Sequence, residues 1–179
     1  MSSPSDSLFP QSLVPPPDSL PQGYTLRPLR GNDHALGHLD PLRDLAAVGE
    51  ISETDWRGRF EEMRRAEGVY YVVVIEWEGP GGERRIVGTG TLVVERKFLF
   101  KLGIQGHVED IAIVKAHQGK QLGGALLAAL NRIAREVGCY KNILDCSLKN
   151  SPFYEKCGFT ERGIEMDIYF DEEAREAHV

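Results

Sequence analysis

The chain has 179 residues, of which 41% are hydrophobic and 27% charged, a composition that suits one globular domain with a substantial core. No apolar run approaches the roughly 20 residues that a membrane-spanning helix needs, so we expect no membrane span. The net charge of −6 argues against nucleic-acid binding, which requires a dense positive surface, but leaves room for a small anionic ligand in a locally basic pocket.

The cysteine and histidine patterns predict no metal and no disulfide framework. The three cysteines, Cys139, Cys146 and Cys157, are odd in number and form no C-x-x-C pair. The five histidines show no zinc-ligand spacing. Residues 1–26 contain no Lys or Arg and no long apolar stretch, so we expect no secretory leader and a cytoplasmic location with reduced thiols.

The first part of the chain predicts an arm followed by a strand. Residues 1–22 are rich in Ser and Pro and predict a disordered or extended arm, with a strap on the domain as the alternative near Gly23. Residues 23–170 are expected to form a single domain, and 171–179 a charged tail. A first strand is predicted at 24–29 from its alternating pattern.

Two helices and a hairpin are predicted next. Asn32-Asp33 is a candidate cap for a helix that ends at Gly49, and Ser52 caps a second helix that runs to about residue 67. A hairpin should join a strand at 70–77 to one at 85–95 through a glycine-rich turn.

Five further elements are predicted in the second half. They are a strand at 107–115, a helix at 122–137, a strand at 141–146, a short helix at 150–157 and a last strand at 159–170. The resulting order β-α-α-β-β-β-α-β-α-β predicts an α/β fold in which a mixed central sheet is flanked by helices on both faces.

The turn at Gln118-Gly119-Lys120-Gln121-Leu122-Gly123-Gly124 is the most informative motif. It follows a strand and opens directly into the strongest predicted helix. Glycines let the backbone approach a ligand closely, and the free N–H groups of a first helical turn form an anion site that suits a pyrophosphate. Neither a Walker P-loop nor a dinucleotide motif is present. From these residues alone, a tight turn without a ligand is an equally good interpretation.

The same turn resembles the Q/R-x-x-G-x-G/A signature of the GNAT superfamily, with Gln121 at the first glycine position. The resemblance implies the GNAT acyl-CoA N-acyltransferase fold and acetyl-CoA as co-substrate, with the pyrophosphate held by the turn and the acetyl end by the preceding strand. The implied cofactor contacts are Ile111, Ala112, Ile113, Gln118, Gly119, Lys120, Gln121, Leu122, Gly123, Asn150, Tyr154 and Lys156.

Further motifs narrow the resemblance to the glucosamine-6-phosphate N-acetyltransferases, fungal ones especially. They are Glu95-Arg96-Lys97, Gly106-His107-Val108-Glu109-Asp110-Ile111-Ala112, Gly138-Cys139-Tyr140-Lys141, Leu144-Asp145-Cys146 and Asn150-x-x-Phe153-Tyr154-Glu155-Lys156-Cys157-Gly158-Phe159. Together they span residues 24 to 168. The resemblance implies a homodimer that acetylates the amine of glucosamine 6-phosphate in UDP-N-acetylglucosamine biosynthesis.

Residue roles follow from the resemblance. Glu109 and Asp110 would bind the sugar near its amine, Asp145 would lie close to that amine, and Tyr154 beside the CoA sulfur. The implied substrate contacts are Lys97, Phe100, Glu109, Asp110, Tyr140, Lys141 and Asp145, with the basic residues supplied by the same or the neighbouring subunit. Three positions depart from the relatives, which often carry His at Phe100, Arg at Tyr169 and Thr at Ala46.

Acyl transfer from a thioester to an amine needs a proton acceptor for the amine, and a proton for the thiolate. Asp145, Glu109 and Tyr154 are the predicted catalytic residues, acting by direct transfer in a ternary complex. Each also has a purely structural interpretation. Asp145 could cap a turn, Glu109 could be a solvated strand end, and Tyr154 could be a core aromatic residue. His107 is expected to be structural. Two other functions stay open, acetylation of a protein or polyamine, and binding of acyl-CoA without catalysis.

Overall fold

The computed structural model describes residues 6–17 and 20–177. The central element is a five-stranded sheet in the order β1-β2-β3-β4-β5, in which β1 to β4 are antiparallel neighbours and β4 and β5 run parallel. The strands are β1 (Tyr24–Pro28), β2 (Tyr70–Glu78), β3 (Arg84–Arg96), β4 (Ile104–Ile113) and β5 (Cys139–Ile143). The predicted mixed sheet is therefore confirmed.

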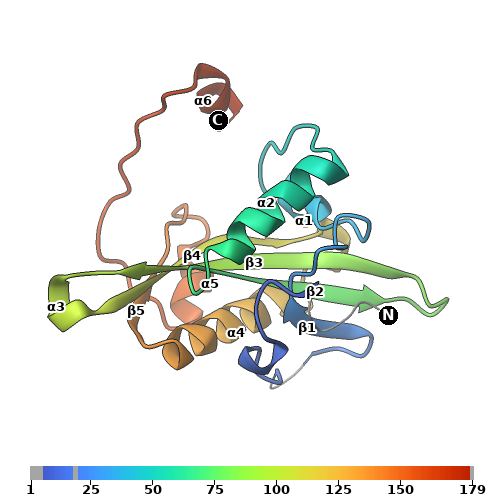
Figure 1. The fold of residues 1–179 in the computed structure, drawn as a ribbon, viewed down its shortest axis with the longest axis horizontal. Helices are drawn as coiled ribbons and strands as arrows, with labels where there is room; N and C mark the ends of the chain where they lie inside the picture. The colour runs from blue at the N-terminus through green and yellow to red at the C-terminus, as the bar shows by residue number, and fades with distance from the viewer. Residues whose placement is uncertain (1–5, 18–19, 178–179) are drawn as a thin grey trace.

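Helices cover both faces of the sheet (Figure 1). α1 (Leu39–Arg43) and α2 (Glu53–Arg65) lie on one face, and α4 (Leu122–Glu136) lies on the other. Two adjacent residues of β3 mark the two faces, because successive residues of a strand point to opposite sides. Thr89 hydrogen-bonds His38 in front of α1, whereas a Cβ on Gly90 would meet Leu130 of α4.

Five short helical elements complete the described chain. They are η2 (Gln11–Leu13), α3 (Leu99–Leu102) at the tip of the β3–β4 hairpin, η3 (Lys115–His117) before α4, α5 (Ser151–Lys156) after β5 and α6 (Glu172–Ala177) near the C-terminus. None of the helices in the described ranges combines the length and apolar character that crossing a bilayer requires.

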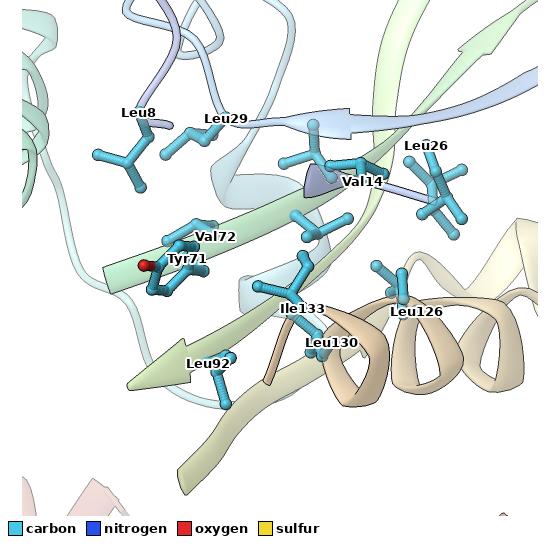
Figure 2. Packing of buried hydrophobic residues seen from close by; sticks show 14 of the residues in the cluster. Leu8, Val14, Leu26, Leu29, Tyr71, Val72, Leu92, Leu126, Leu130 and Ile133 are labelled. Atoms are coloured by element: carbon cyan, nitrogen blue, oxygen red, sulfur yellow. The ribbon is translucent and has the colours of Figure 1, made fainter. Parts of the chain in front are cut away.

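The core forms where the two strongest sequence patterns meet. The centre of β2 is a β-branched run, Val72 to Ile75, that is almost fully buried, as expected for a strand covered on both faces. Leu126, Leu130 and Ile133 of α4 pack against the sheet (Figure 2). Burying each such side chain contributes about 2 kcal/mol.

The N-terminal arm, expected to be disordered or extended over residues 1–22, is ordered where the structure describes it. Over residues 6–17 the arm packs on the domain: the Leu8 amide donates to the Leu29 carbonyl at 2.8 Å, and Phe9 meets the Tyr71 ring edge-on. Figure 2 shows Leu8 beside Leu29 and Val14 in the same apolar layer. These apolar side chains among the prolines explain the order. Residues 1–5 and 18–19 lie outside the described residues.

The helix expected between residues 32 and 49 is mostly wrong. Residues 31–38 form turns, and only Leu39–Arg43 is helical. Asp33 does not cap a helix, because both of its carboxylate oxygens bind the Arg27 guanidinium at 2.7 and 2.8 Å. That ion pair is buried and takes precedence over a local cap. Ser52 does cap its helix, accepting from the Asp55 amide at 3.1 Å.

The strand expected at 159–170 is absent from the described chain. Those residues are extended but join no ladder, and the trace runs clear of the sheet towards α6 (Figure 1). The side chains of Ile164, Met166 and Phe170 are more than 90% exposed. The alternating pattern is therefore present without a partner strand. In the tail expected at 171–179, Glu172–Ala177 is helical, and 178–179 lie outside the described residues.

Candidate functional site

A β-bulge in β4 shapes the centre of the candidate site. Thr91 pairs with Glu109 and Thr89 with Ala112, so Asp110 and Ile111 together oppose the single residue Gly90. Asp110 takes a left-handed backbone with φ of 55°, which is uncommon for a residue with a side chain. Bulges of this kind re-aim side chains next to active sites. Asp110 and its neighbours on β4 are thus placed by an irregularity that the sequence did not reveal.

The parallel strands β4 and β5 separate just before the bulge. Their ladder runs from Ile104↔Cys139 to His107↔Ile143 and extends no further in the described chain. The edge of β4 that carries Ile111, Ala112 and Ile113 therefore has no β5 partner. An extended ligand could bond to backbone groups there, as a strand would.

The turn before α4 provides backbone N–H groups and positive charge. Gly119 has φ of 77° and Gln121 φ of 62°, so the predicted glycine position holds a glutamine in the left-handed region. No side chain caps the α4 N-terminus, and its first turn, which begins at Leu122 and Gly123, contains no acid. Free N–H groups with no competing carboxylate suit an anionic group.

Side chains around this turn form a cluster with β1. The Lys120 ammonium donates to the Tyr24 hydroxyl at 2.9 Å, so that hydroxyl's own hydrogen goes to His117 Nδ1, also at 2.9 Å. Burial, with the charge of Lys120, lowers the pKa of His117, which favours the neutral acceptor form. Gln118 donates its side-chain amide to the Ile113 carbonyl at 3.0 Å. The turn is thus fixed to both β1 and β4.

The predicted carboxylates come together at the ends of β4 and β5. His107 Nε2 lies 3.1 Å from Glu109 Oε1 and 3.3 Å from Asp145 Oδ2. Burial raises the pKa of Glu109; the His107 charge opposes this, while the carboxylates of Asp110, Asp145 and Glu165 raise it further. A carboxylate with a raised pKa is a better proton acceptor.

Tyr154 and Asp145 line one open groove of about 980 Å³ between β5, α5 and residues 158–165. Tyr154 packs edge-on against Phe153 and Phe159. Burial raises the pKa of Tyr154, and nearby Cys146 and Cys157 add to the rise, so its hydroxyl stays protonated at neutral pH. Asn150 and Lys156, at the two ends of α5, are exposed.

The remaining predicted substrate residues form a second group at the hairpin end of the sheet. The Phe100 and Tyr140 rings are 4.9 Å apart, the Lys141 ammonium lies 5.8 Å from the Tyr140 ring centre, and Lys97 pairs with Glu95. Tyr140 donates to Gln105, four residues before Glu109 on β4. Four residues of strand span about 13 Å. Within one chain, the predicted substrate set is therefore split into two groups.

His107 is the functional candidate that the sequence interpretation missed. Its position two residues before Glu109 on a strand placed both side chains on one face, which is a usable signal. The contact with Asp145 could not be foreseen, because it depends on the register of β4 against β5.

Comparison with known proteins gives one consistent result. A profile of the Acetyltransferase (GNAT) family matches residues 39–159. The glucosamine 6-phosphate N-acetyltransferase of Candida albicans is 42% identical over 151 residues, which cover 84% of this chain and 99% of that protein. The Arabidopsis thaliana protein of the same name is 38% identical, covering 83% and 97%.

Solved structures give the same relationship. The crystal structure of glucosamine-6-phosphate N-acetyltransferase from Arabidopsis thaliana superposes with a TM-score of 0.79 at 38% identity, covering 83% of this chain and 99% of that one. A Trypanosoma brucei acetyltransferase superposes with a TM-score of 0.73 at 35% identity, covering 82% and 99%.

Proposed function

The chain belongs to the GNAT acetyltransferase family, and we propose that it transfers the acetyl group of acetyl-CoA to the amine of D-glucosamine 6-phosphate, giving N-acetyl-D-glucosamine 6-phosphate and CoA. The observation that carries the proposal is identity of 35–42% over most of the chain to several relatives named for this reaction. The product would serve UDP-N-acetylglucosamine biosynthesis.

Acetyl-CoA would bind along the opening between β4 and β5. The pyrophosphate fits the uncapped turn at 118–123, where acids are absent from the first turn of α4. The unpaired edge at Ile111–Ile113 would bond the pantetheine arm, and its N–H groups would polarise the thioester carbonyl. Asn150 and Lys156 would flank the cofactor from α5.

The amine would be held by the carboxylates. Glu109 and Asp145 are bridged through one histidine nitrogen, so a protonated amine placed between them would find two acceptors. The amine must lose a proton before it attacks the thioester, and the raised pKa of Glu109 makes this carboxylate a suitable acceptor. Asp110, on the bulge, would contact the sugar hydroxyls. Attack is direct, with no covalent enzyme intermediate.

Tyr154 would serve the departing sulfur. Because burial raises its pKa, the phenol is a weak acid, so its main contribution is a hydrogen bond that orients the sulfur and stabilises its developing charge. This differs from a role as a full proton donor. Tyr154 lines the same groove as Asp145, which supports placing the sulfur near the amine.

We further propose that the protein is a cytoplasmic homodimer. Ile164, Met166, Ile168 and Phe170 alternate along an extended segment and are 75–94% exposed, and exposed apolar surface of this kind marks an interface. The outer edge of β5 is also free of a strand partner in the described chain. A second copy would cover the segment and could bring Lys97, Phe100, Tyr140 or Lys141 to the sugar phosphate.

The test is thiol release from acetyl-CoA with glucosamine 6-phosphate, glucosamine and a lysine peptide as separate acceptors. Turnover with the phosphorylated sugar, and little with the other two, is the expected result. Turnover with the peptide alone would instead support a GNAT enzyme that acts on proteins. Sedimentation analysis of the same preparation checks the dimer, which predicts twice the 20.0 kDa chain mass.

A further inference from the structure

We propose that His107 is a positioning residue for acetyl transfer, holding the Glu109 and Asp145 carboxylates together at one amine-binding point. The inference rests on the function proposed above. It adds a residue to that function. His107 contacts neither substrate in the scheme just given, so it would act only through the two carboxylates.

Strand register explains why the three groups meet. His107 pairs with Ile143 in the parallel ladder between β4 and β5. Two residues further along the chain from this last pair lie Glu109, still on β4, and Asp145, two residues past the end of β5. Because side chains alternate along a strand, Glu109 is on the same face of β4 as His107. Asp145 follows closely after Ile143, the residue opposite His107, and reaches the histidine. The arrangement follows from the backbone.

The hydrogen-bond pattern fixes which atom carries the proton. An ionised carboxylate can only accept, so Nε2 of His107 is the donor in the hydrogen bond to Asp145 Oδ2 at 3.3 Å. The same nitrogen lies 3.1 Å from Glu109 Oε1 as an ion-pair contact. Nε2 is therefore the one atom that contacts both carboxylates. The side chain of His107 is 23% exposed, whereas those of Glu109 and Asp145 are 46% and 49% exposed. The acids thus face the ligand space and the histidine lies behind them.

The charges around Glu109 show that His107 opposes the rise in the pKa of this carboxyl group. Asp110 on the same strand, Asp145 after β5 and Glu165 in the C-terminal segment each raise the pKa of Glu109, and burial raises it most. His107 is the group that lowers it. Without His107, the Glu109 pKa would rise further, and less of this acid would be ionised and able to accept the amine proton.

The experiment compares His107→Leu with His107→Gln. Leucine removes the donor, whereas the glutamine amide can place an N–H near the position of Nε2. We expect His107→Leu to reduce kcat/KM for the sugar phosphate about tenfold or more at neutral pH, to move the acidic limb of its pH profile to higher pH, and to leave KM for acetyl-CoA unchanged. His107→Gln should recover most of the rate and the wild-type limb.

Two results would overturn the proposal. One is a His107→Leu variant with the wild-type rate and pH limb. The other is an equal loss in both variants together with a raised KM for acetyl-CoA, which would indicate a structural role. Wild-type turnover is measured first. If the wild type shows no turnover with glucosamine 6-phosphate, the proposed function is wrong. If the wild type is active and His107→Leu is unaffected, only the role of His107 is wrong.

Discussion

Trp56 donates its indole N–H to Nδ1 of His38 at 3.1 Å, across 18 positions of sequence. Because an indole can only donate, Nδ1 must be the acceptor, and the proton of the neutral imidazole sits on Nε2, 3.3 Å from the Thr89 hydroxyl. Burial lowers the pKa of His38 to about 4, against a partial opposing effect of Asp33. This chain of bonds connects α2, the segment before α1 and strand β3.

The first prediction is a pH-dependent stability that depends on His38. The unfolded histidine titrates near 6.5 and the folded one at about 4, so the unfolded state binds the extra proton between these values. Stability from this group is full above pH 6.5 and is lost as the pH falls towards 4, by about 3 kcal/mol in total. Urea unfolding at several pH values should show a flatter dependence for His38→Gln. Identical slopes in variant and wild type would contradict the assignment.

A second prediction concerns the buried ion pairs of Arg27. The guanidinium is almost fully buried and binds both Asp33 and Glu76. Replacing Asp33 by Ala leaves a buried charge with one partner fewer, which should lower the free energy of unfolding by about 3–5 kcal/mol. Asp40→Ala is the matched control, because its pair with Arg43 is about half exposed and should contribute less than about 1 kcal/mol. Similar losses in both would refute the argument.

Adjacent glycines at the start of α4 give a third prediction. A Cβ on Gly124 meets nothing within 4 Å, so Gly124→Ala should stabilise the protein by about 1 kcal/mol through helix propensity. A Cβ on Gly123 would lie 3.3 Å from the Phe153 ring of α5. Gly123→Ala should therefore gain less stability and reduce kcat, since α5 carries Tyr154. Equal melting temperatures and rates for the two variants would show that α5 can shift to accommodate the added methyl group without loss of stability or activity.

The fourth prediction separates the roles of the two groove residues. Asp145→Asn should reduce kcat about a hundredfold, because the amide lacks the negative charge with which this carboxylate, together with Glu109, holds the amine in position for attack. Tyr154→Phe should reduce kcat less, about tenfold, if its hydroxyl only orients the sulfur. Asp40→Asn, at an exposed position of α1, serves as the control in the same assay and should match the wild type. A lower kcat for Tyr154→Phe than for Asp145→Asn would make Tyr154 the principal catalytic group.

The sequence predicted best those elements whose own residues determine them. β2 and α4 were placed within a residue or two, because a β-branched run and an apolar stripe bury themselves wherever they fold. Asp33 was misread because its partner, Arg27, comes from a strand. The order of the arm around Leu8 was missed for the same reason: its contacts are with residues far along the chain.

The site divides in the same way. The turn at 118–123 and the acids Glu109 and Asp145 could be proposed from motifs. Their geometry could not, since the bulge at Asp110 and the register of β4 against β5 are properties of paired strands. A strand pattern at 159–170 likewise needs a partner before it becomes a strand, and the described chain supplies none.

The arm that reaches back to Leu29 has a consequence for self-association. Its backbone bridge, Ser7 with Arg30, occupies the sheet beside the end of β1, whereas the opposite edge at β5 has no strand next to it in the described ranges. The backbone groups of residues 29–31 that bond to the arm are therefore withheld from other chains. A strand of a neighbouring molecule could not extend the sheet at that point without first displacing the arm.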